Sequence, residues 1–367
     1  MIIAGIMTGT SVDAIDIATC DITSKGDRQT ISLLSFTSAP FQEETRLLIH
    51  RCMIGDASMQ ELCDVPFVLA REFAERLSDH MDASGIRPEA VSVHGQTLWH
   101  HPPASTWQAF AGPALSALTG MTVIHDFRSA DVAIGGQGAP LVPIYDHAMY
   151  ADDTVNRVAL NIGGMANMTI LPAGVSSERV IAFDCGPGNV WIDGATRLTY
   201  GKSFDTNGSI ARAGSVLRPF LAELTSLPYF AVDPPKSTGR ELFTMQELKR
   251  LITKYSHPSS PLEDVVTTLT ELTAWSIVDH LRRYAAETDE VVVSGGGSQN
   301  TYLMERLSVL SSEMASRWTF RIDTQWAAKE AMAFAYLGWR TLQGLPGNIP
   351  SVTGAERAVV LGTIARA

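Results

Sequence analysis

The opening of the chain decides the fold, and it reads Met1-Ile2-Ile3-Ala4-Gly5-Ile6-Met7-Thr8-Gly9-Thr10-Ser11-Val12-Asp13-Ala14-Ile15-Asp16-Ile17-Ala18-Thr19-Cys20-Asp21-Ile22. An apolar run over residues 2–6 stops at a turn around Gly9, and apolar alternation resumes at Ile15. This pattern predicts a strand, a tight turn and a second strand. Residues 30–38 are expected to add a third strand.

A second segment of the same kind lies near the middle of the chain. Residues 157–162 form an apolar run, a glycine-bearing turn follows at 163–167, and apolar residues return at 168–171. We interpret this echo as a duplication of architecture rather than a repeat of sequence. Because a single core stops growing at roughly 250–300 residues, we expect two α/β halves, each opening with a hairpin.

The remaining apolar patterns predict short strands and longer helices in alternation. Further strands are expected over residues 91–93, 122–124, 180–183 and 290–294. Helices are expected over residues 45–54, 67–83, 190–200, 261–286 and 329–342. The helix over 261–286 has the spacing of an amphipathic helix with one apolar face.

Composition and charge exclude several classes of protein. The 28 basic and 39 acidic residues give a net charge of −11, and such a surface repels a nucleic-acid backbone. The four cysteines lack the spacing of a zinc site, which favours free thiols in a reducing compartment. The N-terminus lacks the basic region of a signal peptide, and no apolar window of about 20 residues predicts a membrane span. We expect a cytoplasmic protein without nucleic-acid or membrane partners.

Four predicted strands end in turns that carry glycine, near Gly9, Gly163, Gly186 and Gly295. In open α/β folds, ligands bind outside the carboxyl ends of the strands. Four such turns therefore favour one ligand cleft between two domains. The alternative is that each glycine only closes a hairpin, an explanation that suits one turn better than all four.

The first turn has the composition of an anion site. Gly9, Thr10 and Ser11 carry no bulky side chain, so successive backbone N–H groups can approach a phosphate. Asp13 and Asp16 follow, and a carboxylate beside bound phosphates is usually there for Mg²⁺. The alternative for Asp13 is a turn former that bonds its own backbone. The turn is not a P-loop, because the Gly-x4-Gly-Lys-Ser/Thr pattern is absent.

Two later turns offer a candidate general base and a candidate nucleoside site. Asp184, expected at the end of a buried strand, is a candidate general base, with a helix cap as its alternative role. Residues 295–297 are all glycine, which lets a flat ring such as adenine lie against the backbone. The alternative is a plain turn from strand to helix.

The turns of the first half hold further polar candidates. His94 and His125 sit at strand ends, where a lone histidine is more often structural than catalytic. Arg128 and Asp131 precede a glycine-rich turn at residues 135–140. Polar groups on that turn either grip a sugar or an acid, or simply pair with each other.

Together these motifs resemble those of the anhydro-N-acetylmuramic acid kinases, which belong to the actin/hexokinase-like ATPase superfamily. The match spans almost the whole chain in the family's order and rests on GIMTGTSVD (5–13), HGQT (94–97), DFR (126–128), GGQGAPLVP (135–143), NIGGMAN (161–167), FDCGPGN (183–189), PKSTGRE (235–241), GGG (295–297) with Asn300, KEA (329–331) and PSVTGA (350–355). Each motif is modest, but the combination is highly specific.

The resemblance implies a two-domain actin-like ATPase (ribonuclease H-like) fold with an interdomain active-site cleft. The expected domains are residues 1–130 with approximately 345–367, and residues 131–344. Enzymes of this family open the 1,6-anhydro bridge of 1,6-anhydro-N-acetylmuramic acid with water at C1 and phosphorylate O6 from ATP. The products are N-acetylmuramic acid 6-phosphate and ADP, in peptidoglycan recycling. ATP, Mg²⁺ and this sugar are the expected ligands, and a homodimer is compatible with the resemblance.

The resemblance also implies roles for individual residues. Asp184 is expected to be the catalytic base that activates the water, and Asp13 to face the metal. The residues expected to bind the nucleotide are Gly9, Thr10, Ser11, Val12, Asp13, Ala14, Ile15, Asp16, Asn161, Gly163, Gly164, Gly186, Gly188, Asn189, Gly295, Gly296 and Gly297. The residues expected to bind the sugar are His94, Gln96, Thr97, Arg128, Asp131 and Gln137. Arg128 is expected to pair with the lactyl carboxylate in bidentate fashion.

The sequence departs from the family pattern at three positions. Thr8 replaces the usual Ser and keeps a hydroxyl, whereas Cys185 replaces a Thr and removes a hydroxyl donor beside Asp184. Ala14 replaces a Gly, which requires a φ below zero at that position. Two other functions stay open: a relative that phosphorylates another sugar or hydrolyses ATP, and a non-catalytic binding or filament-forming relative of actin. A pure scaffold would not need both Asp184 and Asp13.

Overall fold

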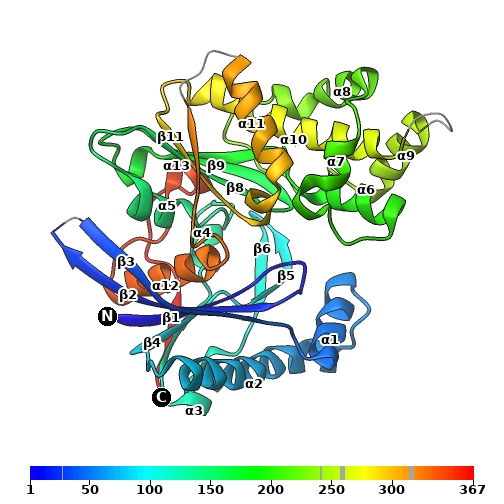
Figure 1. Ribbon diagram of the computed structural model, residues 1–367. Coiled ribbons are helices and arrows are strands. Elements are labelled where there is room, and N and C mark those ends of the chain that lie inside the picture. Colours follow the sequence, from blue (N-terminus) through cyan, green and yellow to red (C-terminus); the bar gives the residue numbers. More distant parts are fainter. Residues whose placement is uncertain (27, 240–241, 257–260, 314–317) are drawn as a thin grey trace. The chain divides into compact units, whose positions relative to one another are not determined.

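The protein is described by a computed structural model that covers residues 1–26, 28–239, 242–256, 261–313 and 318–367 (Figure 1). Contacts divide the chain into two compact units. The first unit comprises residues 1–149 and 328–367, and the second comprises residues 150–327. These boundaries fall at other positions than the expected domain boundaries near residues 130 and 345.

The first unit is built on a sheet of six strands. In spatial order these are β13 (Thr363–Ala365), β7 (Thr122–His125), β4 (Ala90–Val93), β1 (Ile2–Thr8), β2 (Ile15–Lys25) and β3 (Arg28–Ala39). Strand β1 is antiparallel to β2 and parallel to β4, and β3 is antiparallel to β2. The predicted opening of strand, turn and strand, with a third strand beside it, is therefore confirmed.

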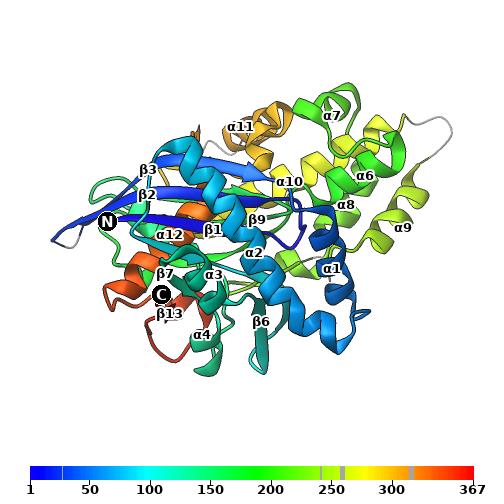
Figure 2. The ribbon, with the colours of Figure 1, turned by 90° about the horizontal axis from the view of Figure 1, so that it is seen from below.

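Helices cover both faces of this sheet (Figures 1 and 2). Helix α2 (Met59–Ser84) crosses one face and buries Val65, Leu69 and Phe73 against the strands. Helix α12 (Lys329–Leu342) packs on β1 across the other face. A Cβ atom on Gly5 would stand 2.0 Å from the carbonyl oxygen of Ala331, so this packing requires glycine. The close packing of α12 on β1 is why the contacts assign residues 328–342 to the first unit.

The other elements of this part of the chain are short. They are α1 (Glu43–Ile54), β5 (Gln96–His101), β6 (Ser105–Ala109), α3 (Gly112–Thr119), α4 (Ser129–Ala133), α5 (Pro143–Tyr150) and α13 (Pro350–Thr353). Strands β5 and β6 form a separate hairpin that the sequence patterns did not predict.

The second unit repeats the strand order of the first. Its sheet runs β10 (Ile181–Pro187), β9 (Met165–Leu171), β8 (Arg157–Ile162), β11 (Glu290–Ser294) and β12 (Thr319–Ile322). Strand β8 is antiparallel to β9 and parallel to β11, as β1 is to β2 and β4. Both sheets thus contain the order 3-2-1-4-5, with strand 2 antiparallel, which is the ribonuclease H-like arrangement. The predicted duplication of architecture and the α/β class are confirmed.

Helix α10 (Glu263–Tyr284) is the centre of the second unit. It contacts α6 (Val190–Tyr200), α11 (Thr301–Glu313) and β10, as well as two shorter helices. Those and the remaining helical elements are α7 (Ser209–Ala213), α8 (Arg218–Thr225), α9 (Met245–Tyr255), η1 (Ser177–Arg179), η2 (Thr206–Gly208), η3 (Pro228–Ala231) and η4 (Gly296–Gln299).

The interpretation of α10 as a helix with one apolar face is wrong. Thr267, Thr270 and Thr273 are buried as completely as its leucines. The hydroxyl of Thr270 donates to the carbonyl of Val266 at 2.8 Å. Because such hydroxyls bond within the helix, polar residues can be buried on several of its sides.

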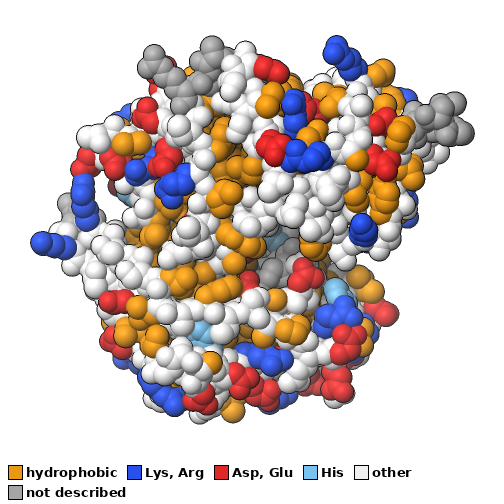
Figure 3. Space-filling view, in the orientation of Figure 1, with side chains coloured by type: hydrophobic (Ala, Val, Ile, Leu, Met, Phe, Trp, Pro, Cys, Tyr) orange, Lys and Arg blue, Asp and Glu red, His pale blue; other side chains and the backbone are white. Residues whose placement is uncertain are grey.

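Charge on the visible surface is mixed. On the face drawn in Figure 3, acidic and basic side chains of the described residues are interspersed, and no broad basic patch gathers there. Within the described part of the chain, no helix is long and apolar enough to cross a membrane.

Candidate active site

The turn after β1 presents polar residues outward on a strained backbone. Thr10, Ser11 and Asp13 are exposed, whereas Val12 is buried. Val12 has a φ of 58° and donates its N–H to the carbonyl of Gly9 at 3.2 Å. A β-branched residue with positive φ is a true outlier and is typical of functional turns. Ala14 is not among the described non-glycine residues with positive φ, so the condition for replacing glycine there is met.

Parallel pairing of β1 with β4 brings the second motif beside this turn. The backbone N–H of His94 donates to the carbonyl of Ile6 at 3.0 Å. The hydroxyl of Thr8 donates to the carbonyl of Gly95 at 3.2 Å, and Gln96 Nε2 donates to the carbonyl of Gly9 at 3.3 Å. Gln96 is fully buried, and its Oε1 has no hydrogen-bond partner among the described residues. A buried acceptor of this kind suits a ligand donor.

The next strand places Arg128 against His94. Strand β7 pairs in parallel with β4, so the residues after both strands lie side by side. Arg128 Nη2 and Nε donate to His94 Nε2 at 2.9 and 3.2 Å, while His94 Nδ1 lies 2.7 Å from the carbonyl of Gly95. Because arginine only donates and a carbonyl only accepts, His94 is the neutral tautomer with its proton on Nδ1.

Electrostatics agree with this assignment. Burial, and then the charge of Arg128, hold the pKa of His94 well below its ordinary value. Burial also lowers the pKa of Arg128 to about 10, and Glu330 acts in the opposite direction. Arg128 is therefore a cation beside a neutral imidazole, and its Nη1 has no hydrogen-bond partner among the described residues.

Asp131 holds the glycine-rich turn rather than facing a ligand. It is fully buried, and its carboxylate accepts from the N–H of Gly138, the amide of Asn348 and the hydroxyl of Thr353, each at 2.7 Å. This geometry does not support the expected direct contact between Asp131 and the sugar. Of the two alternatives for this turn, internal pairing describes Asp131. Gln137 is exposed and remains available.

Helix α12 begins with two charged residues that the sequence reasoning gave no role, although it quoted their motif. Lys329 is buried and lies 2.8 Å from Asp146 Oδ1. The next residue, Glu330, interacts electrostatically with Asp16 and Arg128. Burial raises the pKa of Asp16, and a hydrogen bond from Ser38 partly offsets that rise. The buried ion pair thus fixes the start of α12, from which Glu330 projects.

Three glycine-bearing turns of the second unit meet one another. The N–H groups of Gly188 and Asn189 donate to the carbonyls of Gly164 and Gly163 at 2.9 and 2.8 Å. A Cβ atom on Gly188 would stand 2.4 Å from the carbonyl oxygen of Gly163.

Asn161 and the 295–297 turn are part of the same assembly. A Cβ atom on Gly295 would stand 2.6 Å from Asn161 Oδ1, and one on Gly297 would stand 2.3 Å from Ile162. These glycines are therefore required by close packing as well as by any ligand.

Asp184 lies within β10, so the expectation that it ends the strand is wrong. The pairing of β10 with β9 shifts between Asp184 and Gly186, and Gly186 has a φ of 145°. Such a bulge turns a side chain away from the regular alternation of the strand. The carboxylate Oδ2 of Asp184 accepts the backbone N–H of Thr238 at 2.8 Å. Helix α6 begins after Asn189 without a side-chain cap, so Asp184 does not cap that helix.

Residues around Asp184 are fixed by further bonds. Tyr229 donates its hydroxyl to the backbone carbonyl of Asp184 at 2.7 Å. Lys236 Nζ lies 4.6 Å from the centre of the Tyr229 ring. Cys185 is buried, and that burial raises its pKa well above the ordinary value. Residues 240–241 of the PKSTGRE motif lie outside the described residues.

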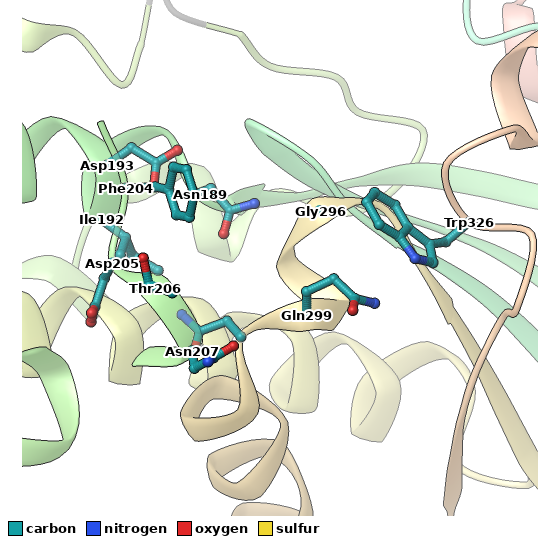
Figure 4. Close-up of a pocket in the computed structure, with 11 residues that line it drawn as sticks. Asn189, Ile192, Asp193, Phe204, Asp205, Thr206, Asn207, Gly296, Gln299 and Trp326 are labelled. Atoms are coloured by element: carbon teal, nitrogen blue, oxygen red, sulfur yellow. The ribbon is translucent and has the colours of Figure 1, made fainter. Parts of the chain in front are cut away.

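A pocket of about 390 Å³ opens beside the glycine turns of the second unit (Figure 4). Its walls come from α6, the loop into η2, η4 and the loop before α12. The lining residues are Asn189, Ile192, Asp193, Phe204, Asp205, Thr206, Asn207, Gly296, Gln299, Asn300 and Trp326. Asn189 and Gly296 were predicted to bind the nucleotide, whereas the aromatic walls were missed because Phe204 and Trp326 stand in no recognisable motif.

The predicted site residues thus form one group in each unit. In the first unit, the turn at 9–16 lies with His94, Gln96 and Arg128. In the second unit, Asn161, Gly163, Gly164, Gly188, Asn189 and Gly295–Gly297 lie together, and Asp184 is on the adjoining strand. Among the described residues, no cluster of three or more His, Cys, Asp or Glu side chains could hold a metal. The predicted metal role of Asp13 stays a prediction.

The two units share the ribonuclease H-like strand order and carry glycine turns beyond their strands, which agrees with the expected two-domain actin-like ATPase fold. The profile described as anhydro-N-acetylmuramic acid kinase matches residues 1–367. The chain belongs to the anhydro-N-acetylmuramic acid kinase family, which makes it an enzyme, an ATP-using kinase.

Individual relatives match over their whole length. An anhydro-N-acetylmuramic acid kinase from Bacillus cereus (strain Q1) is 37% identical over 379 residues, covering 99% of this chain and 99% of the relative. One from Bacillus anthracis (strain A0248) is 38% identical with the same coverage.

Solved structures also resemble the chain. A ROK hexokinase from Thermus thermophilus has a TM-score of 0.41 and 14% identity, covering 93% of this chain and 99% of that one. A ROK family glucokinase from Streptomyces griseus, solved with glucose and AMPPNP, has a TM-score of 0.41 and 12% identity, covering 92% and 99%. With TM-scores this low, the family assignment rests on the sequence matches.

Proposed function

We propose that this chain opens the 1,6-anhydro ring of 1,6-anhydro-N-acetylmuramic acid with water and phosphorylates O6 from ATP. The products are N-acetylmuramic acid 6-phosphate and ADP, and the role is cell-wall recycling in the cytoplasm. The observation that supports this best is the full-length match, over residues 1–367, to a family of that name.

The nucleotide is assigned to the glycine turns and to the pocket beside them. A base and ribose suit the pocket of about 390 Å³, which has an aromatic residue at either end. The backbone N–H groups of residues 9–11 and 163–164 would hold phosphates, because glycine turns let anions approach the backbone. Asp13 would face Mg²⁺, which takes one or two protein carboxylates and keeps several waters. When bound, Mg²⁺ supplies charge neutralisation at the phosphates.

Asp184 is assigned as the base. Its Oδ2 is held by the backbone N–H of Thr238 at 2.8 Å, which fixes the direction of the carboxylate. A carboxylate held in this way can accept a proton from a water within hydrogen-bond reach. The bulge between Asp184 and Gly186 gives the carboxylate a position that a regular strand would not.

The sugar is assigned to the polar group around Arg128. The Nη1 edge of its guanidinium would pair with the lactyl carboxylate, because the Nε edge already faces His94. The unpartnered Oε1 of Gln96 would accept an N–H or O–H of the sugar. Asp131 acts indirectly, by holding the turn that carries Gln137.

The direct test mixes purified protein, MgATP and 1,6-anhydro-N-acetylmuramic acid and follows ADP and sugar phosphate together. We expect one sugar phosphate, identified by mass spectrometry, for each ADP. Glucose and N-acetylglucosamine serve as control acceptors and should give none. ATP consumption without a phosphorylated anhydro sugar, or an equal rate with a control sugar, would overturn the substrate assignment.

A further inference from the structure

Asp193 is an unpaired carboxylate in the wall of the pocket. It lies on α6, and its side chain is partly buried. No described residue donates a hydrogen bond to this carboxylate or forms a close ion pair with it, although the charge of Arg197, one helical turn further on, acts on it. Burial is the main cause that raises its pKa to about 6. A carboxylate short of donors in a ligand pocket gains from a ligand that supplies them.

Two other polar side chains of the pocket, those of Asp205 and Asn300, are already engaged. Asp205 accepts the backbone N–H groups of Ile210 and Ala211, each at 2.9 Å, and so holds the start of α7. Asn300 Oδ1 accepts the N–H of Leu303 at 3.0 Å. Of the two aspartates in the pocket wall, Asp193 is therefore the one whose acceptor sites remain for a ligand.

Its position on α6 places Asp193 away from the turn assigned to the phosphates and away from the end of the pocket assigned to the adenine base. Asn189, at the start of this helix, donates its N–H to Gly163 in the assigned phosphate turn. Asp193 follows one helical turn later, and its N–H donates to the Asn189 carbonyl at 2.8 Å. One turn advances about 5.4 Å, a distance suited to the ribose rather than to a phosphate.

The end of the pocket opposite Asp193 suits the adenine base of the nucleotide. Trp326 lies at the other end from Asp193 and Phe204, with Gly296 and Gln299 between them (Figure 4). A flat base needs the flat surfaces of an indole ring and a glycine backbone. With the base there, the sugar of the nucleotide falls to the end that holds Asp193.

We propose that Asp193 accepts hydrogen bonds from the ribose hydroxyls of the nucleotide and makes the enzyme select ribonucleotides. This inference rests on the proposed nucleotide site. An ionised carboxylate is acceptor-only, so it matches a pair of hydroxyl donors and gains nothing from a sugar that lacks them. The side chain is thus a specificity-determining group rather than a catalytic one.

The test measures binding by calorimetry, without turnover, for ADP and 2′,3′-dideoxy-ADP. For the wild type we expect ADP to bind about ten- to hundredfold more tightly, as hydrogen bonds to a charged group imply. In Asp193→Ala the ADP affinity should fall to that for dideoxy-ADP, which itself changes little. Asp193→Asn should keep part of the preference. Asp64→Asn, the same chemical change on the exposed part of α2, should behave as wild type.

The outcomes that overturn the inference differ from those that overturn the kinase assignment. Equal wild-type affinity for the two nucleotides would overturn it. So would an Asp193→Ala variant that weakens ADP and dideoxy-ADP alike, because the carboxylate would then act on the base or the fold. If neither nucleotide binds the wild type, the assignment of a nucleotide site fails, and the inference fails with it. Failure to phosphorylate the anhydro sugar, with the ribose preference intact, would instead overturn only the proposed substrate.

Discussion

Hydrogen bonds hold both the backbone and the side chain of Asp184. Its N–H donates to the carbonyl of Lys236 at 3.1 Å, and its carbonyl accepts the Tyr229 hydroxyl at 2.7 Å. The side chain accepts the Thr238 N–H. The position of this one residue is therefore fixed by a segment more than forty residues further along the chain.

Asp184→Asn is expected to lower turnover about 10²- to 10⁴-fold, because an amide cannot accept the proton that the carboxylate accepts. Its Oδ1 can still accept the Thr238 N–H, so the fold and the affinity for ADP should be kept. Steady-state kinetics and calorimetry with ADP measure the two effects separately. Turnover within a few-fold of wild type would contradict the role of Asp184 as base.

His280 is a buried titratable residue that the proposed reaction does not use. Its Nδ1 lies 2.6 Å from the carbonyl of Ser276, its Nε2 has no hydrogen-bond partner among the described residues, and its ring stacks on Tyr284. Burial lowers its pKa to about 4 from the ordinary 6.5. The unfolded chain then binds the proton first as the pH falls, so the residue's contribution to stability is lost below about pH 6.5.

For the change from about pH 7 to about pH 5, this shift predicts a loss of about 2 kcal/mol in the free energy of unfolding. His280→Phe removes the titrating group and keeps an aromatic ring beside Phe183 and Tyr284. Its stability should therefore decline less steeply with acid than that of the wild type. Urea unfolding at both pH values checks this, and parallel declines for the two proteins would contradict it.

At the scale of elements, α12 depends on one buried ion pair. Lys329 and Asp146 have side chains that are each 5% exposed, and Asp146 belongs to α5. The pair therefore ties the start of α12 to a second helix at a depth where water cannot solvate either charge.

Lys329→Met should destabilise the protein by about 3–5 kcal/mol, because it removes the cation that lies beside the buried Asp146 carboxylate. The double variant Lys329→Met/Asp146→Leu should recover most of that loss, since no buried charge remains. Urea unfolding of both variants measures the difference. A double variant as unstable as the single one would show that the pair is not what holds α12.

Much of the element pattern could be predicted, because apolar alternation marks strands wherever one face is buried. The bounds of β11 and α12 agree with residues 290–294 and 329–342. The hairpin of β5 and β6 was missed because its Trp99 and Trp107 are exposed, which gives no apolar alternation. The burial of threonines in α10 was missed because satisfied hydroxyls leave no trace in hydropathy.

The candidate site was predicted in part. Glycine turns could be recognised because only glycine lets two backbone segments approach as closely as Gly188 approaches Gly163. The polar side chains that remain available for a ligand could not be predicted, because their availability depends on partners that are distant in the sequence. The carboxylate of Asp131 accepts hydrogen bonds from Asn348 and Thr353, which lie far along the chain. Asp193 belongs to no motif that the sequence analysis recognised.

At the scale of the whole molecule, the chain leaves the first unit after residue 149 and returns to it at residue 328. The second unit is continuous in sequence, so all of its strands and helices are synthesised before residue 328 is reached. The first unit must wait for α12, which covers one face of its sheet, and for the edge strand β13. The second unit can therefore complete its fold during synthesis before α12 exists, while the sheet of the first unit still lacks the helix that covers one of its faces.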